Sequence, residues 1–172
     1  MLKNLEQFVP SSVCLKCDGC CRFKESASSW RPKVSPAEKK QGGLAEEIFS
    51  RNSLDRTGRI KTVACSGGGY QCSFFNPQGN NCSIYQKRPF ECQLYPFVLT
   101  QDNNKTVIDV HLHCPFVQET RNTPVFDRYV RYLEGYFKRK EVLDFIRENP
   151  ALVGDYTNYR DELEYLFAIN WE

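Results

Sequence analysis

The chain has 172 residues, of which 41% are hydrophobic and 26% are charged, and its formal net charge at pH 7 is +2. This length and composition suit one folded domain with a real core and exclude global disorder. The small net charge argues against a protein that binds nucleic acid phosphates or anionic lipid. No stretch reaches the roughly 18 apolar residues that cross a bilayer, and the N-terminal sequence lacks the apolar segment of a secretory signal. We therefore expect a cytoplasmic protein with no nucleic acid and no membrane among its partners.

Two local patterns predict regular structure in the first half of the chain. Residues 35–38, Ser-Pro-Ala-Glu, form a capping box, with a Ser at the N-cap, Pro at the first helical position and Glu at the third. A helix is expected to follow and, although weakened at the glycines 42–43, to continue to about Asn52. Residues 59–64 alternate in the manner of a strand.

The second half of the chain gives clearer signals. Residues 97–101 and 105–111 read as two strands, and Asp-Asn-Asn at 102–104 reads as a hairpin turn between them. Three helices are predicted, at 125–137, 141–148 and about 157–170. Apolar residues at helical spacing mark the first and the third, and a sequence that ends helices follows the second.

Together these elements predict an α+β fold, in the form of a small irregular domain with short strands and a helical C-terminal segment. All nine cysteines lie between Cys14 and Cys114. We therefore expect a metal-binding region over residues 1–115 and a helical segment over residues 116–172 that packs on it within a single structural domain.

The cysteines are better explained by metal than by disulfides. Nothing in the sequence exports the chain, nine is an odd number, and a domain of this length needs no disulfides to hold its core. Without export the thiols stay reduced, and a dense set of reduced cysteines is typical of a metal site.

The sharpest motif is Cys14-Leu-Lys-Cys17-Asp-Gly-Cys20-Cys21. A C-x-x-C turn places two thiolates on one side of a tight loop, close enough to bind one metal. Three cysteines at these spacings are similar to the ferredoxin-type run, in which one loop supplies three ligands of an iron–sulfur cluster. Adjacent side chains are expected to diverge, so Cys20 and Cys21 either serve two neighbouring centres or only one of them is a ligand.

A second set of cysteines is too widely spaced to form one loop. Cys72, Cys82 and Cys92 are ten residues apart and Cys114 follows 22 residues later, so they can meet only through the fold. With the first motif they make eight thiols, which suit two four-thiolate centres, one cluster plus a zinc ion, or one cluster with a supporting pair. Cys114-Pro115 repeats the Cys-Pro dipeptide of the remote ligand in ferredoxin-type sites. Cys65, beside three glycines, is interpreted as a spare thiol.

Such a centre needs positive charge nearby, because four thiolates around Zn²⁺ or a four-iron cluster leave a net charge of about −2. Arg88 precedes Pro89, which is well placed to open a helical turn that runs to Leu94. This turn would hold the guanidinium near Cys82 and Cys92. Arg88 is therefore predicted to bind the cofactor by contacting sulfur rather than metal.

These motifs carry a resemblance. The cysteine motif, followed by Cys72-Ser-Phe-Phe and by Cys82-Ser-Ile-Tyr-Gln-Lys-Arg-Pro-Phe-Glu-Cys92, resembles the CxxCxxCC cysteine-cluster family, of YkgJ type. Proteins of this family are described as zinc- or iron-chelating and are often labelled iron–sulfur proteins. The resemblance covers about residues 12–115 and implies that the family's cluster cysteines are Cys14, Cys17, Cys20, Cys21, Cys72, Cys82 and Cys92, with Arg88 and Pro89 in its signature. Cys65 and the C-terminal segment lie outside the pattern.

Three functions are compatible with the sequence. The leading hypothesis is a protein with one or two iron–sulfur centres, most simply 4Fe-4S, that acts as a redox or sensing module or as part of a modification enzyme, with a redox or protein partner. The second is a zinc-binding structural or interaction protein without catalysis. The third is a component of a lysine-methylase-like enzyme, which rests only on a related cysteine arrangement in longer flagellin lysine N-methylases.

Other chemistry is sparse. His111 and His113 lie two residues apart on the presumed strand, on one face with Asp109, and are more simply read as solvent-facing than as metal ligands beside Cys114. The glycines at 67–69 lack the Lys-Ser/Thr of a phosphate-binding loop.

Overall fold

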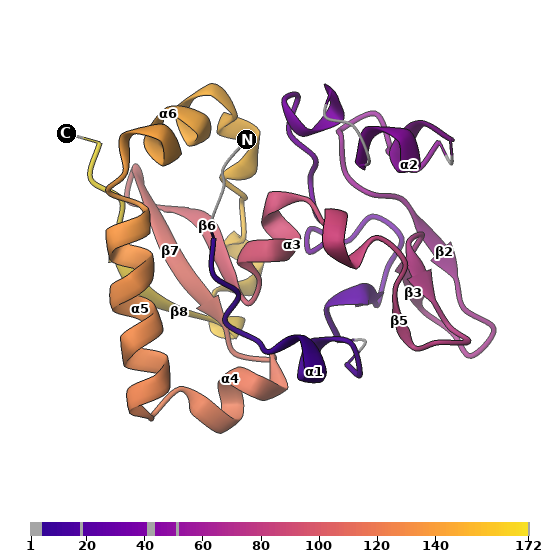
Figure 1. Ribbon diagram of the computed structural model, residues 1–172, viewed down its shortest axis with the longest axis horizontal. Coiled ribbons are helices and arrows are strands. Elements are labelled where there is room, and N and C mark those ends of the chain that lie inside the picture. The colour runs from indigo at the N-terminus through magenta and orange to yellow at the C-terminus, as the bar shows by residue number, and fades with distance from the viewer. Residues whose placement is uncertain (1–4, 18, 41–43, 51, 172) are drawn as a thin grey trace. The chain divides into compact units, whose positions relative to one another are not determined.

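The computed structural model of the chain describes residues 5–17, 19–40, 44–50 and 52–171 (Figure 1). It confirms the α+β class, with helices and small antiparallel sheets. The chain divides into two compact units, one of residues 10–93 and one of residues 94–171 together with residues 5–9. The division predicted near residue 115 stays a prediction. In the described part of the chain, no helix is long and apolar enough to cross a membrane.

The first unit consists of short elements. In chain order they are α1 (Ser11–Cys14), the 3-10 turn η1 (Gly19–Cys21), β1 (Arg22–Phe23), the 3-10 turn η2 (Glu38–Lys40), α2 (Leu44–Ser50), β2 (Thr62–Ala64), β3 (Tyr70–Cys72), β4 (Phe75–Asn76), β5 (Asn81–Cys82), the 3-10 turn η3 (Tyr85–Lys87) and α3 (Phe90–Leu94). β3 lies between β1 and β2 in one antiparallel sheet, and β4 pairs with β5 in another.

A small apolar core holds these elements together. Its buried members come from every part of the unit: Phe23, Val34, Leu44, Ile48, Ile60, Cys72, Phe74, Phe75 and Ile84. Two of the candidate ligands, Cys21 and Cys82, pack against this core while Cys72 is part of it. Cys21, Cys72 and Cys82 are therefore fixed by the same packing that folds the unit.

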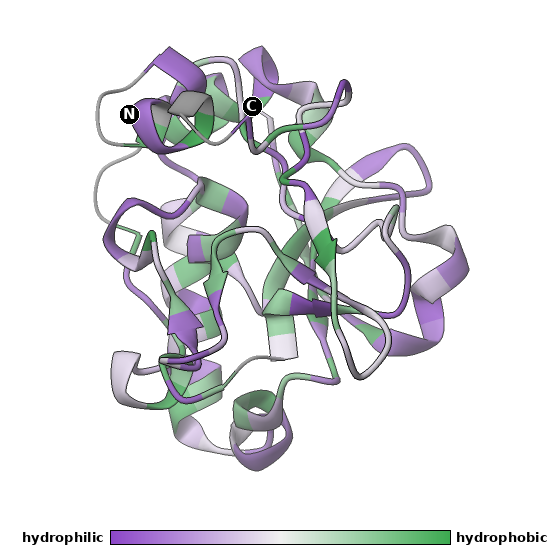
Figure 2. Cartoon of the chain, turned by 90° about the vertical axis from the view of Figure 1, so that its right-hand side faces the viewer, coloured by the Kyte–Doolittle hydropathy of each residue, from purple (hydrophilic) through white to green (hydrophobic). Residues whose placement is uncertain are grey.

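The second unit is more regular. Its elements are β6 (Phe97–Asp102), β7 (Lys105–His111), α4 (Pro115–Thr120), α5 (Pro124–Tyr136), α6 (Lys140–Glu148), the 3-10 turns η4 (Pro150–Leu152) and η5 (Thr157–Glu162), and β8 (Leu163–Ala168). The sheet is antiparallel, in the order β6-β7-β8, and Figure 1 shows α5 running beside it. Figure 2 colours the chain by hydropathy and shows apolar and polar residues interspersed along its helices and strands.

The second unit has an aromatic core. Phe8, from the N-terminal segment, is 6% exposed and contacts four rings, those of Phe97, Phe116, Phe126 and Tyr129, at centroid distances of 4.9–5.7 Å. These rings come from β6, α4 and α5. Phe126 and Tyr129 of α5 therefore pack in the core, as the helical spacing of apolar residues over 125–137 indicated.

Most local predictions for the second unit are confirmed. The hairpin β6–β7 turns at Asn103 and Asn104, whose φ angles of 46° and 63° are those of the two central residues of a type I′ turn. The helices α5 and α6 follow the predicted ranges closely. The helix predicted at 157–170 is wrong, because residues 157–162 form a 3-10 turn and β8 then pairs with β7. A helix there would have left the outer edge of β7 without a hydrogen-bonding partner.

Two predictions for the first unit are confirmed only in part. Ser35 and Glu38 form the reciprocal bonds of a capping box, but they lead into a 3-10 turn, and α2 begins only at Leu44. The glycines at 42–43 lie outside the described residues. The strand predicted from Arg59 is regular only from Thr62.

Candidate metal centre

The N-terminal cysteines are gathered by two short helical pieces. Cys14 ends α1, and the N–H of Cys17 donates to the carbonyl of Cys14 over 3.3 Å. Cys20 and Cys21 lie together in the turn η1, where their thiols hydrogen-bond to each other. The expectation that these adjacent side chains diverge is therefore wrong, because the 3-10 turn does not give successive residues the opposite directions of an extended strand.

Cys72 and Cys82 occupy equivalent places in two strands. Each is the last residue of its strand, β3 or β5, and each is followed by Ser and an apolar residue. The sulfur of Cys72 accepts the backbone N–H of Phe74, and that of Cys82 accepts the N–H of Ile84. Residue 75 in β4 pairs with Cys82, so the chain returns within ten residues and brings the second cysteine back beside the first.

Cys92 lies on the short helix α3, which the carboxylates of the buried Glu38 and the half-buried Glu91 fasten to the segment 33–38. Glu38 accepts the N–H of Phe90 at 2.6 Å and the N–H of Ser35 at 2.8 Å. Glu91 accepts the N–H of Lys33 at 2.7 Å. Burial raises the pKa of Glu91 to about 7, against the Lys33 N–H and the positive charges of Arg59 and Lys33, which lower it.

Three contacts join the N-terminal motif to the later cysteines. The Asn80 amide donates to the carbonyl of Lys16 over 3.1 Å, and the Tyr85 hydroxyl donates to the Ser11 hydroxyl over 3.0 Å. The third contact comes from Arg88 and is described below. Hydrogen bonds therefore hold the segment that carries Cys14 and Cys17 against the segment that follows β4 and carries Cys82.

The thiols of the two sets act on one another. Burial raises the pKa of Cys72 to about 12, with a further rise from Cys82 and Cys20. Burial also raises the pKa values of Cys92, Cys14 and Cys82, and in each case the nearby Cys20 raises it further. For Cys21 the thiol of Cys20 is the largest cause of a raised pKa, and burial is the second.

Cys20 is therefore the common neighbour of five other thiols, and it is exposed to solvent. Cys17 also raises the pKa of Cys14. Its sulfur lies close to Gly19, since a β-carbon added to that glycine would be 3.6 Å from it. All nine cysteines are among the described residues, and each is a thiol rather than half of a disulfide. The structure thus brings seven thiols together, and the raised pKa values of Cys14, Cys21, Cys72, Cys82 and Cys92 reflect their burial and the cost of charging several sulfurs near one another.

Arg88 supplies positive charge to this group of thiols. Its Nη1 donates to the Cys14 sulfur over 3.7 Å, and its guanidinium lies 3.7 Å from the centre of the Tyr85 ring. The Arg88 Nε donates to the Tyr85 carbonyl over 2.8 Å, which fixes the side chain. The same guanidinium lowers the pKa values of Cys14, Cys82 and Cys92.

Comparison with protein families identifies this arrangement. Residues 13–115 match the model of the CxxCxxCC family, which is described as a "putative zinc- or iron-chelating domain". The chain belongs to this family. Comparison with curated proteins and with solved structures found no match to either.

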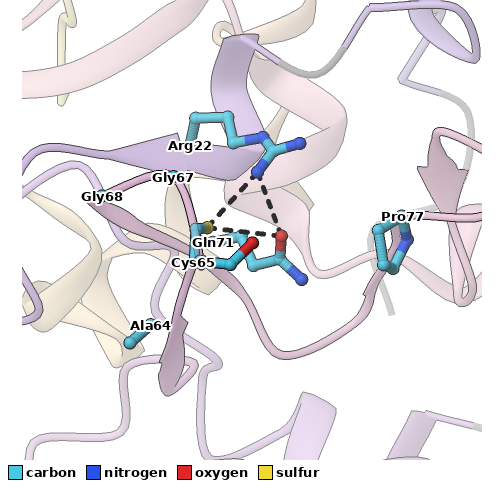
Figure 3. Close-up of a pocket in the computed structure, with 8 residues that line it drawn as sticks. Arg22, Ala64, Cys65, Gly67, Gly68, Gln71 and Pro77 are labelled. Carbon is cyan, nitrogen blue, oxygen red and sulfur yellow. Dashed lines mark hydrogen bonds between the residues drawn. The ribbon is translucent and has the colours of Figure 1, made fainter.

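In this CxxCxxCC protein, Cys65 has contacts that differ from those of the seven thiols. It lies in the turn between β2 and β3, where its sulfur accepts from the Arg22 guanidinium at 3.3 Å and donates to Gln71 at 3.4 Å (Figure 3). These residues line an open pocket of about 490 Å³. The Cys65 sulfur thus contacts an arginine and an amide, and its interpretation as a spare thiol stays a prediction.

Cys114 and the two histidines lie in the second unit. Cys114 is buried and immediately precedes α4, and its role as a ligand stays a prediction. The side chain of His111 is only 12% exposed, so it does not face solvent as expected, whereas that of His113 is 63% exposed. Burial lowers the pKa of His111, Glu162 acts in the opposite direction, and His113 adds to the lowering.

Sequence reasoning missed the residues that position the ligands. The contacts of Glu38 and Glu91 join segments more than fifty residues apart, so no local sequence pattern predicts them. The repeated Cys-Ser-apolar sequence at residues 72–74 and 82–84 is a signal that was available, because an N–H two residues after a cysteine is well placed to donate to its sulfur.

Proposed function

We propose that this CxxCxxCC protein holds iron and sulfide in an iron–sulfur centre, or in two adjacent centres, and serves as a redox or sensing module. The proposed ligands come from the seven thiols gathered around Cys20: Cys14, Cys17, Cys20, Cys21, Cys72, Cys82 and Cys92. Cys114 is proposed as a further ligand on the strength of its Cys-Pro sequence. The observation that carries the proposal is the number of thiols, since a structural zinc ion takes four.

The donor set fits such a group. Soft thiolates select zinc, Cu(I) and iron–sulfur clusters, and a cation would offset the burial and the mutual repulsion that raise the pKa values of Cys14, Cys72, Cys82 and Cys92. When bound, a cluster would supply one-electron redox chemistry. The protein's own part is to hold the sulfurs through β3, β5, η1 and α3, and to place N–H groups and the Arg88 guanidinium against them.

The exposure of Cys20 supports a sensing or electron-transfer role. Most of the thiols are half-buried and Cys72 is buried, whereas Cys20 is exposed. A centre with one exposed ligand is accessible to a small oxidant or to a partner protein on that side only.

Serine variants test the proposal, with Cys65 as the matched control. Protein is purified without oxygen, and iron, sulfide and visible absorbance are measured for the wild type and for Cys72→Ser, Cys82→Ser and Cys65→Ser. We expect Cys72→Ser and Cys82→Ser to lose at least half of the iron and of the absorbance, and Cys65→Ser to keep both. Colourless wild-type protein with stoichiometric zinc would overturn the iron–sulfur proposal in favour of a zinc-stabilised interaction protein.

A further inference from the structure

A second group of potential metal ligands lies in the second unit, made of residues outside the cysteine motif. It consists of the only two histidines of the chain, His111 and His113, together with Glu162. The His111 Nε2 lies 3.3 Å from the Glu162 Oε2, and the His113 Nδ1 lies 3.4 Å from the same oxygen. One ligand atom from each residue lies within 4.8 Å of the other two.

The sheet holds these three side chains in place. His111 ends β7 and pairs with Leu163 of β8, so Glu162 directly precedes the paired residue. The N–H of Leu112 donates to the carbonyl of Glu162 over 2.9 Å, which continues the pairing one residue beyond His111. The N–H of His111 donates to the carbonyl of Pro96, also over 2.9 Å. The backbone on both sides of the group is therefore fixed by the ladder.

His111 and Glu162 form a long hydrogen bond, and both separations also match those of ligands on one metal ion. A hydrogen bond between a charged imidazole and a carboxylate is usually about 2.7–2.9 Å long. Two donors bound to one zinc ion at about 2.0–2.2 Å, with tetrahedral angles, lie about 3.3–3.5 Å apart. The observed 3.3 Å and 3.4 Å fall in the second range.

A tyrosine orients the first ring. The Tyr95 hydroxyl lies 2.9 Å from the Nδ1 of His111. When this Nδ1 carries the proton and donates it to the hydroxyl oxygen, the lone pair of the ring is on Nε2, the atom that faces Glu162. Metal-binding histidines generally have such a partner on their other nitrogen.

We propose that His111 Nε2, His113 Nδ1 and Glu162 Oε2 bind one divalent transition-metal ion, such as Zn²⁺ or Fe²⁺. Two histidines and one carboxylate are the protein ligands of catalytic zinc in several hydrolases and of iron in non-haem oxygenases. The side chain of His113 is 63% exposed, so the remaining coordination positions are open to water or to a substrate. All three proposed ligands lie in the second unit, and none of them belongs to the seven thiols of the first.

The test adds Zn²⁺ to protein whose cysteine centre is already loaded. Bound zinc and retained iron are counted after dialysis, and the two imidazole rings are followed by ¹⁵N NMR. We expect one extra zinc per chain, with the His111 ring protonated at Nδ1 and the His113 ring protonated at Nε2. Because the chain has no other histidine, the ring signals need no further assignment to this group.

Variants make the test specific. His113→Gln changes an exposed side chain and is expected to fold, and with Glu162→Gln it should weaken zinc binding at least tenfold. Tyr95→Phe should weaken it by about tenfold through the lost hydrogen bond. Glu164→Gln, which changes a carboxylate on β8 that pairs with Arg121, is the matched control and should bind zinc as the wild type does. Equal zinc binding by wild type and His113→Gln, or unchanged ring signals at saturating zinc, would overturn the proposal.

Discussion

The carboxylate of Glu38 offers a demanding test of how the first unit holds Cys92. Glu38 is 9% exposed and accepts two backbone N–H groups, from Ser35 at 2.8 Å and from Phe90 at 2.6 Å. Glu38→Ala leaves both donors buried and unpaired, at a cost of about 1–3 kcal/mol each. We therefore expect the free energy of unfolding to fall by about 4 kcal/mol, within a range of about 2–6 kcal/mol.

This loss is large against a total stability of about 5–15 kcal/mol for a domain. Glu38→Gln keeps one acceptor oxygen but turns an amide NH₂ toward the second donor, so its loss should be smaller than that of Glu38→Ala. Urea denaturation followed by tryptophan fluorescence measures both, with the exposed Glu46→Ala on α2 as the control expected to change stability by less than about 0.5 kcal/mol. If Glu38→Ala unfolds at the same urea concentration as Glu46→Ala, the assigned role of Glu38 is refuted.

Three further predictions concern other parts of the chain. Phe8→Ala removes a ring that contacts four others and should lower the stability by about 3–5 kcal/mol in thermal unfolding, whereas Val125→Ala, whose side chain is on the surface, should change it little. Burial pushes the pKa of Asp55 upward, but hydrogen bonds from Thr57, Arg31 and the Arg59 N–H outweigh it and bring the pKa to about 2, below its ordinary 3.8. Because folding lowers this pKa, the stability that the carboxylate contributes is present at neutral pH and is lost as the pH falls through about 2. The difference in unfolding free energy between wild type and Asp55→Asn should therefore be about 1–2 kcal/mol at pH 7, and urea titrations should show it shrinking from pH 5 downward. A difference that stays constant with pH would contradict the assignment. Arg88→Gln should lower the midpoint potential of the proposed centre in a redox titration, since the guanidinium beside Cys14 favours the added electron, and Arg88→Lys should lower it less; an unchanged potential in Arg88→Gln would count against this contact.

Predictions from the sequence succeeded where the signal is local. The hairpin turn at Asn103-Asn104, the amphipathic helix α5 and the bonds between Ser35 and Glu38 each depend on residues only a few positions apart. The helix predicted over Leu163–Ala168 was wrong because this segment pairs with the edge of β7, which lies more than fifty residues earlier in the chain.

The candidate site divides in the same way. The spacing of Cys14, Cys17 and Cys20 predicts that a single loop supplies several metal ligands. The meeting of that loop with Cys72 and Cys82 depends on two short sheets and an apolar core, which no spacing rule supplies. The histidine site needs Glu162, which approaches His111 only because the predicted C-terminal helix is in fact a strand.

The central claim is that the gathered thiols hold iron and sulfide rather than a single zinc ion. The most direct measurement is the amount of iron, zinc and acid-labile sulfide per chain in wild-type protein purified without oxygen from unsupplemented cells, with its visible spectrum. The account predicts about four or about eight irons with equal sulfide, according to whether one or two cubane clusters form, and a broad visible absorbance. One or two zinc ions per chain without iron or sulfide would contradict it.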